Sequence, residues 1–152
     1  MTCNKHPELK GLTMINYLKS VALVLSMLAV MPAMAEQARP PIADKVKAYR
    51  GTQGEKVWTL RVGERSANQA LVQIDGIDHD WQLKIQKMDV QKTRTEVSYS
   101  IGSGENKIVV LTVRGGTGEL RLPGEPQLID VGYDGSLSEA SSAGALLTDY
   151  LK

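Results

Sequence analysis

The chain has 152 residues, 18 Lys and Arg against 17 Asp and Glu, and a formal net charge of +1. That length is typical of one domain. The balanced charge gives no basic patch of the kind that nucleic acid or an anionic membrane surface requires, so those two classes of partner are set aside.

The N-terminal segment reads as an export signal. Lys19 precedes an apolar run over 21–30, and the small-residue tripeptide Ala33-Met34-Ala35 follows. This order predicts a secretory signal peptide over residues 1–35, with Met14 as an alternative start and cleavage before Glu36. The run is shorter than the roughly 20 apolar residues that a bilayer-spanning helix needs.

Cleavage of the signal peptide would leave residues 36–152 as the mature chain. Residues 36–152 are expected to form a single soluble β-rich domain in the periplasm, with release to the medium as the alternative. The one cysteine, Cys3, lies within the predicted signal, so the mature chain has no disulfide. Glu36, where a lipid-anchored protein would carry cysteine, argues against a stable membrane anchor.

The first predicted element is a short helix over 42–49. Pro41 suits the first position of a helix, because its missing N–H has no partner there in any case. Ile42, Val46 and Tyr49 then recur on one helical face.

Strands are predicted from Val57 onward. Apolar and polar residues alternate over 57–62, 70–74, 81–86 and 94–101, which indicates strands with one buried face. The run 108–113 is apolar almost throughout and suits a strand covered on both faces. Shorter strands follow at 119–122 and 127–131. The Gly- and Pro-containing connections are short, which favours an antiparallel meander.

The chain is expected to end in an amphipathic helix. Ser138 is a good N-cap, and an apolar stripe follows at Ala143, Leu146, Leu147, Tyr150 and Leu151. The predicted class is therefore α+β: an antiparallel sheet of about six or seven strands with a helix at each end. Trp58 and Trp81 lie on the apolar sides of their strands and are predicted to pack in the core.

Two exposed turns are candidate binding tips. The first is the polar hairpin tip formed by Ser103, Glu105, Asn106 and Lys107. The second is Tyr133 with Asp134 in a Gly-Tyr-Asp-Gly turn, where a tyrosine can anchor a partner. Loops carried on a rigid sheet are a common place for recognition residues.

A third cluster has the residue types of a metal or hydrolytic site. Asp75, Asp78, His79 and Asp80 bring three carboxylates and an imidazole together. The spacing does not match an EF-hand loop, and no G-x-S-x-G elbow or H-E-x-x-H motif accompanies it. A solvated hairpin is the favoured interpretation, and no cofactor is expected.

In size and export signal the chain is similar to small periplasmic inhibitors, such as lysozyme inhibitors and immunity proteins against secreted toxins. That resemblance implies a non-enzymatic protein that binds another protein or a cell-envelope ligand, and it carries over no site residue. One alternative is a metal-dependent or hydrolytic module built on the Asp75–Asp80 cluster. Another is a structural component of the envelope, in which the apolar strand at 108–113 would pair with a donor strand if it lay at an edge.

Overall fold

The computed structural model describes residues 38–152. The predicted signal peptide lies outside this range, so export and cleavage stay predictions. Within the range, no helix combines the length and the apolar character that crossing a membrane would require.

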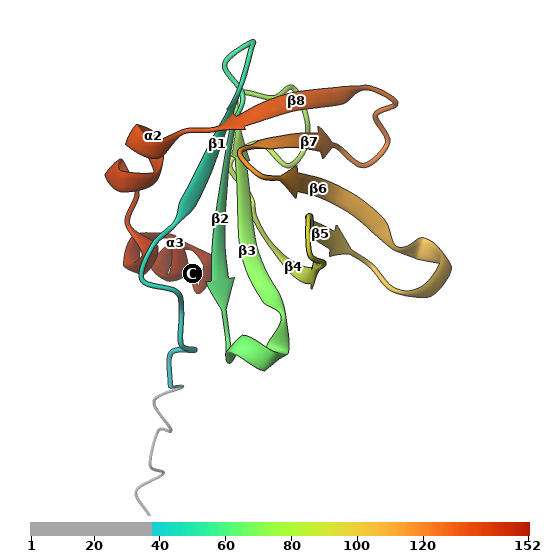
Figure 1. Cartoon of the computed structure of the whole chain (residues 1–152). Helices are drawn as coiled ribbons and strands as arrows, with labels where there is room; N and C mark the ends of the chain where they lie inside the picture. The colour runs from blue at the N-terminus through green and yellow to red at the C-terminus, as the bar shows by residue number, and fades with distance from the viewer. Residues whose placement is uncertain (1–37) are drawn as a thin grey trace, which may run out of the picture. The chain divides into compact units, whose positions relative to one another are not determined.

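Eight antiparallel strands form a closed barrel (Figure 1). Each strand pairs with its neighbours in sequence, and the last pairs with the first through Tyr49↔Tyr133. The strands are β1 Lys47–Gly51, β2 Lys56–Val62, β3 Gln69–Asp75, β4 Ile85–Lys92, β5 Val97–Ile101, β6 Ile108–Arg114, β7 Thr117–Arg121 and β8 Leu128–Tyr133. The predicted antiparallel order is right, but the sheet is closed and has more strands than the expected six or seven.

The prediction and the structure differ most over residues 42–49, for which the sequence predicts a helix. Residues 47–51 form β1, and Ile42 makes an isolated bridge to Val62. Both edges of β1 are paired, one with β2 and one with β8. Helical spacing of three apolar residues is a weak preference, and closing the sheet satisfies two rows of backbone groups that would otherwise lack partners.

The predicted strand at 81–86 is also revised, because β4 begins only at Ile85. Residues 76–84 form a loop of successive turns in which Gln82 N–H donates to the carbonyl of His79. This loop packs Ile77 and Trp81 against the barrel core, as predicted for Trp81. Leu83 within it has φ 60°, an unusual conformation for a branched residue.

The barrel interior is filled by side chains. Alternate residues of every strand face inward, as the pleat requires. The buried set includes Tyr49, Val57, Val72, Met88, Tyr99, Leu111, Leu120 and Val131. Burial raises the pKa of Tyr99, while a hydrogen bond with the Thr59 side chain partly offsets that effect. The contact between Tyr99 and Thr59 links β5 to β2 across the interior.

Two short helices, not one, end the chain: α2 Gly135–Ala140 and α3 Ala143–Tyr150. Asp134 caps the first and Ser142 the second, so Ser138 is not the N-cap that the sequence suggested. The predicted apolar stripe does pack on the sheet. Leu146 and Leu147 lie against the outward-facing Leu60 and Leu71. Trp58 belongs to this outer cluster, and its Nε1 donates to Ser141 Oγ at 2.9 Å.

Candidate functional site

Because the strands alternate in direction, four loops gather at one end of the barrel. We call this the loop end, and it comprises residues 52–55, 76–84, 102–107 and 122–127. The predicted tip at 103–107 and the acidic cluster at 75–80 therefore lie at the same end. Tyr133 and Asp134 lie at the opposite end, where β8 finishes.

The hairpin tip at 102–107 is exposed and pre-formed. Its centre is a single turn of 3-10 helix, Gly104–Asn106, and all four predicted side chains are exposed. Gly102 has φ +85°, and a Cβ there would collide with the carbonyl oxygen of Asn106. The backbone conformation is thus set before any partner arrives, which lowers the entropy cost of binding.

Next to this tip, β6 separates from β7. Among residues 38–152, Ile108 and Val109 pair with β5 alone, and the β6–β7 ladder begins only at Leu111↔Leu120. Figure 1 shows the β5–β6 and β7–β8 hairpins diverging at this point. Two features of the chain account for the separation. A register shift at Tyr99/Ser100 leaves Val110 as the extra residue of a bulge, and Pro123, just past β7, has no N–H with which to extend the ladder.

The separation leaves a groove of about 550 Å³ on the outer face of the barrel. Three apolar side chains line it with high exposure: Ile108 at 38%, Val109 at 43% and Leu128 at 44%. We name this feature the β6 groove. The prediction that 108–113 is covered on both faces is therefore wrong for its first two residues.

The charges around the β6 groove are only partly neutralised. Arg114 Nε pairs with Glu96 Oε2 at 2.8 Å. Lys107, Glu119 and Arg121 also line the groove, and no ion pair of the described chain includes them. The groove thus combines three exposed apolar side chains, a short unpaired backbone edge, and polar and charged lining residues.

A second groove of about 550 Å³ lies at the loop end. Glu55, Asp78, Glu125 and Asp130 are among its lining residues, and none of the lining residues is basic. Glu55 is buried, and its Oε2 accepts a hydrogen bond from the backbone N–H of Gln53 at 3.0 Å. Gly51 leaves the space that this carboxylate occupies.

Two members of the Asp75–Asp80 cluster, Asp75 and His79, have structural partners, whereas Asp78 and Asp80 are exposed. Asp75 pairs with Lys56 at 3.1 Å and accepts hydrogen bonds from Gly76 N–H and the Gln82 amide. The hydrogen bond from Lys56 is the largest influence that lowers the pKa of Asp75. Both oxygens of this carboxylate thus already have hydrogen-bond or ion-pair partners.

His79 is engaged as well. Its Nδ1 lies 3.1 Å from the amide nitrogen of Trp81, and its Nε2 lies 2.9 Å from the carbonyl oxygen of Pro123. The Nε2–H tautomer satisfies both contacts, since the amide can only donate and the carbonyl can only accept. Within residues 38–152 no group of three or more His, Cys, Asp or Glu side chains is arranged to hold a metal ion. The geometry therefore gives the metal and hydrolytic alternative no support.

Tyr133 and Asp134 also have structural partners. Tyr133 is the last residue of β8 and not part of a turn, and its ring meets that of Tyr49 edge to face at 6.0 Å. Asp134 caps α2 by accepting from Leu137 N–H, and it pairs with Arg50 at 2.7 Å. These two contacts, the cap first, lower its pKa. Tyr133 is still 53% exposed and free to contact another molecule.

The fold and its grooves define a class: a small antiparallel barrel in which side chains fill the interior and grooves lie on the surface. Comparison of the chain with protein-family models, curated proteins and solved structures finds no match. Of the β6 groove, sequence reasoning found Lys107 and named the strand 108–113 as a possible edge for a donor strand, but it missed Arg121 and Leu128. The signal that could have found them is Pro123, which limits the length of the strand that would otherwise cover β6.

Proposed function

We propose that the protein is an exported, non-enzymatic binding protein that takes an extended segment of another protein into the β6 groove. The hairpin tip Ser103–Lys107 adjoins this site and contributes Lys107 to the lining of the groove. The observation that carries the proposal is the edge of β6 at 108–109, which pairs on one side only and has exposed apolar side chains.

An extended segment fits this surface for two reasons. An unpaired strand edge presents N–H and C=O groups that a second extended backbone can satisfy. The exposed side chains Ile108, Val109 and Leu128 offer apolar contacts alongside that edge, which backbone pairing alone does not provide.

The filled interior supports an external site as well. The largest inward side chains, among them Leu111 and Leu120, are fully buried, which leaves the outer face and the loops for recognition. Location in the periplasm and action as an inhibitor or immunity protein are part of the proposal. They depend on the predicted signal peptide and on the resemblance in size.

The test compares two leucines of similar exposure, Leu128 in the groove at 44% and Leu151 at the C-terminus at 52%. Envelope extract is passed over wild-type protein, Leu128→Lys and Leu151→Lys. A partner held by wild type and Leu151→Lys but lost from Leu128→Lys supports the proposal, and equal retention by all three contradicts it. Changing Ser103, Glu105 and Lys107 together to alanine tests the hairpin tip. Unchanged affinity for the captured partner would remove the tip from the site.

Light scattering addresses the envelope-component alternative, in which the edge pairs with a second copy of the chain. A wild-type dimer that Leu128→Lys converts to a monomer would assign the groove to self-association instead of a foreign segment.

A further inference from the structure

A second feature lies at the end of the barrel opposite the loop end, on inward-facing positions. Alternation on β1 places Lys47 on the same side as the buried Tyr49. Register agrees, because Lys47 pairs with Thr59, which is buried on the inward face of β2. Lys47 is therefore an inward residue at the start of its strand.

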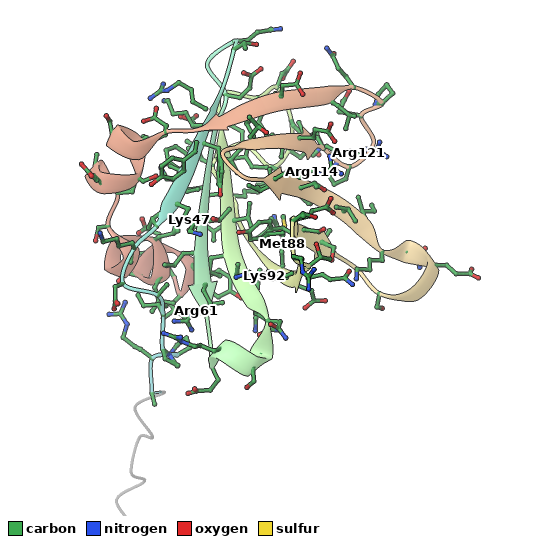
Figure 2. All side chains as sticks on the ribbon, in the orientation of Figure 1. Lys47, Arg61, Met88, Lys92, Arg114 and Arg121 are labelled. Atoms are coloured by element: carbon green, nitrogen blue, oxygen red, sulfur yellow. The ribbon has the colours of Figure 1, made fainter. Side chains whose placement is uncertain are left out.

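The same reasoning applies to two further cations. Arg61 pairs with Ala70, which belongs to the buried interior, and is the last inward residue of β2. Lys92 pairs with Val97, which packs against the same interior, and is the last residue of β4. Figure 2 labels Lys47, Arg61 and Lys92 on these three strands.

All three positions belong to one end of the barrel. β1 starts at this end, whereas β2 and β4 run toward it and finish there. We call this ring of cations the basic mouth. The exposed ring of Tyr133, also an inward residue, closes β8 at the same end.

Inward positions of a small barrel are ordinarily apolar. Lys47 and Lys92, both exposed, and the partly buried Arg61 depart from that pattern at the ends of their strands. Inward charges can protect the edge of an open sheet from aggregation, but this sheet is closed, and the short edge left open at 108–109 lies on β6, which carries none of these cations. No ion pair of residues 38–152 includes Lys47, Arg61 or Lys92. The one hydrogen bond recorded for the Arg61 side chain runs from Nη1 to the carbonyl of Gly63 at 2.9 Å.

Two carboxylates on or next to β4 do not neutralise this ring. Glu96, in the β4–β5 turn, is already paired with Arg114 at 2.8 Å. Asp89 on β4 has the opposite parity to Met88 and so faces outward. Like charges gathered without counter-charge repel one another, and an anion placed among them removes that repulsion.

We propose that the basic mouth binds the anionic group of a small ligand, a phosphoryl or carboxylate group held between the two ammonium groups and the Arg61 guanidinium. Ammonium and guanidinium donors form strong, charge-assisted hydrogen bonds with such oxygens. The filled interior limits how far the ligand enters, so the anionic group lies at the mouth and the remainder of the ligand lies outside. This site is distinct from the β6 groove and does not depend on it.

The test is a titration of the isotope-labelled full chain with inorganic phosphate, followed by amide resonances at constant ionic strength. Constant ionic strength keeps general screening from mimicking binding. Saturable shifts centred on residues 47, 61 and 92 are expected. Lys92→Met should weaken binding roughly fivefold, as expected for the loss of one charged donor at an exposed site.

The matched control is Lys87→Met, which removes an exposed lysine on the outward face of the same strand. It should leave the affinity within about twofold of wild type, since it is not in the mouth. If Lys92→Met fails to fold, Lys47→Met is measured in its place.

A parallel titration with citrate distinguishes carboxylate from phosphoryl groups, and saturable binding of either supports the site. Shifts that do not saturate with either anion overturn the proposal. Equal weakening by Lys87→Met and Lys92→Met also overturns it, because the effect would then reflect net charge alone.

Discussion

Ser138 Oγ accepts a hydrogen bond from the backbone amide of Ala48 at 2.8 Å, and it donates to the Asp134 carbonyl at 2.7 Å. This buried hydroxyl joins α2 to the outer face of β1, the strand that closes the barrel. One side chain thus connects the C-terminal helices to the closure of the sheet.

Removing this hydroxyl should therefore destabilise the whole domain. Ser138→Ala leaves the buried Ala48 N–H without a partner, and we expect a loss of about 1–2 kcal/mol in the free energy of unfolding. Ser136→Ala, an exposed serine in the same helix, should stay within about 0.5 kcal/mol of wild type. Urea unfolding measures both. A Ser138→Ala protein as stable as the control would show that the hydroxyl has no such role.

Gly102 should be essential to the hairpin tip. Gly102→Ala requires a side chain at φ +85° and brings its Cβ against the Asn106 carbonyl, at a cost of about 1–3 kcal/mol. Gly116→Ala, in the β6–β7 turn, meets nothing within 4 Å and should be tolerated. Thermal unfolding compares the two. Similar melting temperatures would mean that the tip relaxes around the new side chain.

High pH should weaken the fold through Tyr49. Burial, followed by the nearby phenols of Tyr99 and Tyr133, raises the pKa of Tyr49 to about 12. The unfolded chain loses this proton near pH 10, so the folded state holds more protons above that pH. Stability should accordingly fall by about 1–2 kcal/mol as the pH rises from about 10 to about 12.

Tyr49→Phe should remove that part of the decline, whereas Tyr150→Phe in α3 should retain it. Urea unfolding at pH 9, 10 and 11 gives the comparison. A parallel decline in wild type and Tyr49→Phe would contradict the assignment to Tyr49.

Low pH should destabilise the fold through protonation of Asp75 and Asp134. Hydrogen bonds from Lys56 to Asp75, and from Leu137 N–H and Arg50 to Asp134, lower the pKa of each carboxyl. Their stabilisation is present above the ordinary carboxyl pKa of about 4 and is lost as the pH falls through the lower folded values. Asp134→Asn keeps an oxygen that can cap α2 but does not titrate, so its stability should change less between pH 4 and pH 2. Asp149→Asn, an exposed control, should follow wild type.

Local sequence pattern was enough to find most of the strands. Alternation located β2, β3 and β5, because the apolar faces of β3 and β5 pack in the barrel interior and that of β2 packs against the C-terminal helices. The apolar spacing of α3 likewise predicted its packing, since Leu146 and Leu147 must share a helix face to reach the sheet together. The hairpin tip followed from its glycines and polar residues, whose conformation depends on near neighbours alone.

The errors arose where a distant partner decided the outcome. Residues 47–51 became a strand because β8, more than 75 residues later in the chain, pairs with them. The same long-range closure turned a predicted sheet of six or seven strands into a barrel of eight. It also placed Lys47, Arg61 and Lys92 around one opening, which no local pattern indicates.

By itself, the order of the residues determined the antiparallel pairing of successive strands, the tight turns and the apolar face of the last helix, because each depends on contacts between neighbours in the chain. Only the tertiary structure decided that the sheet closes, that β6 separates from β7, and that Asp75 and His79 of the candidate metal cluster take structural partners on other segments. Those outcomes depend on register and on pairing between distant strands, and a side chain's exposure or partner is known only once that pairing exists.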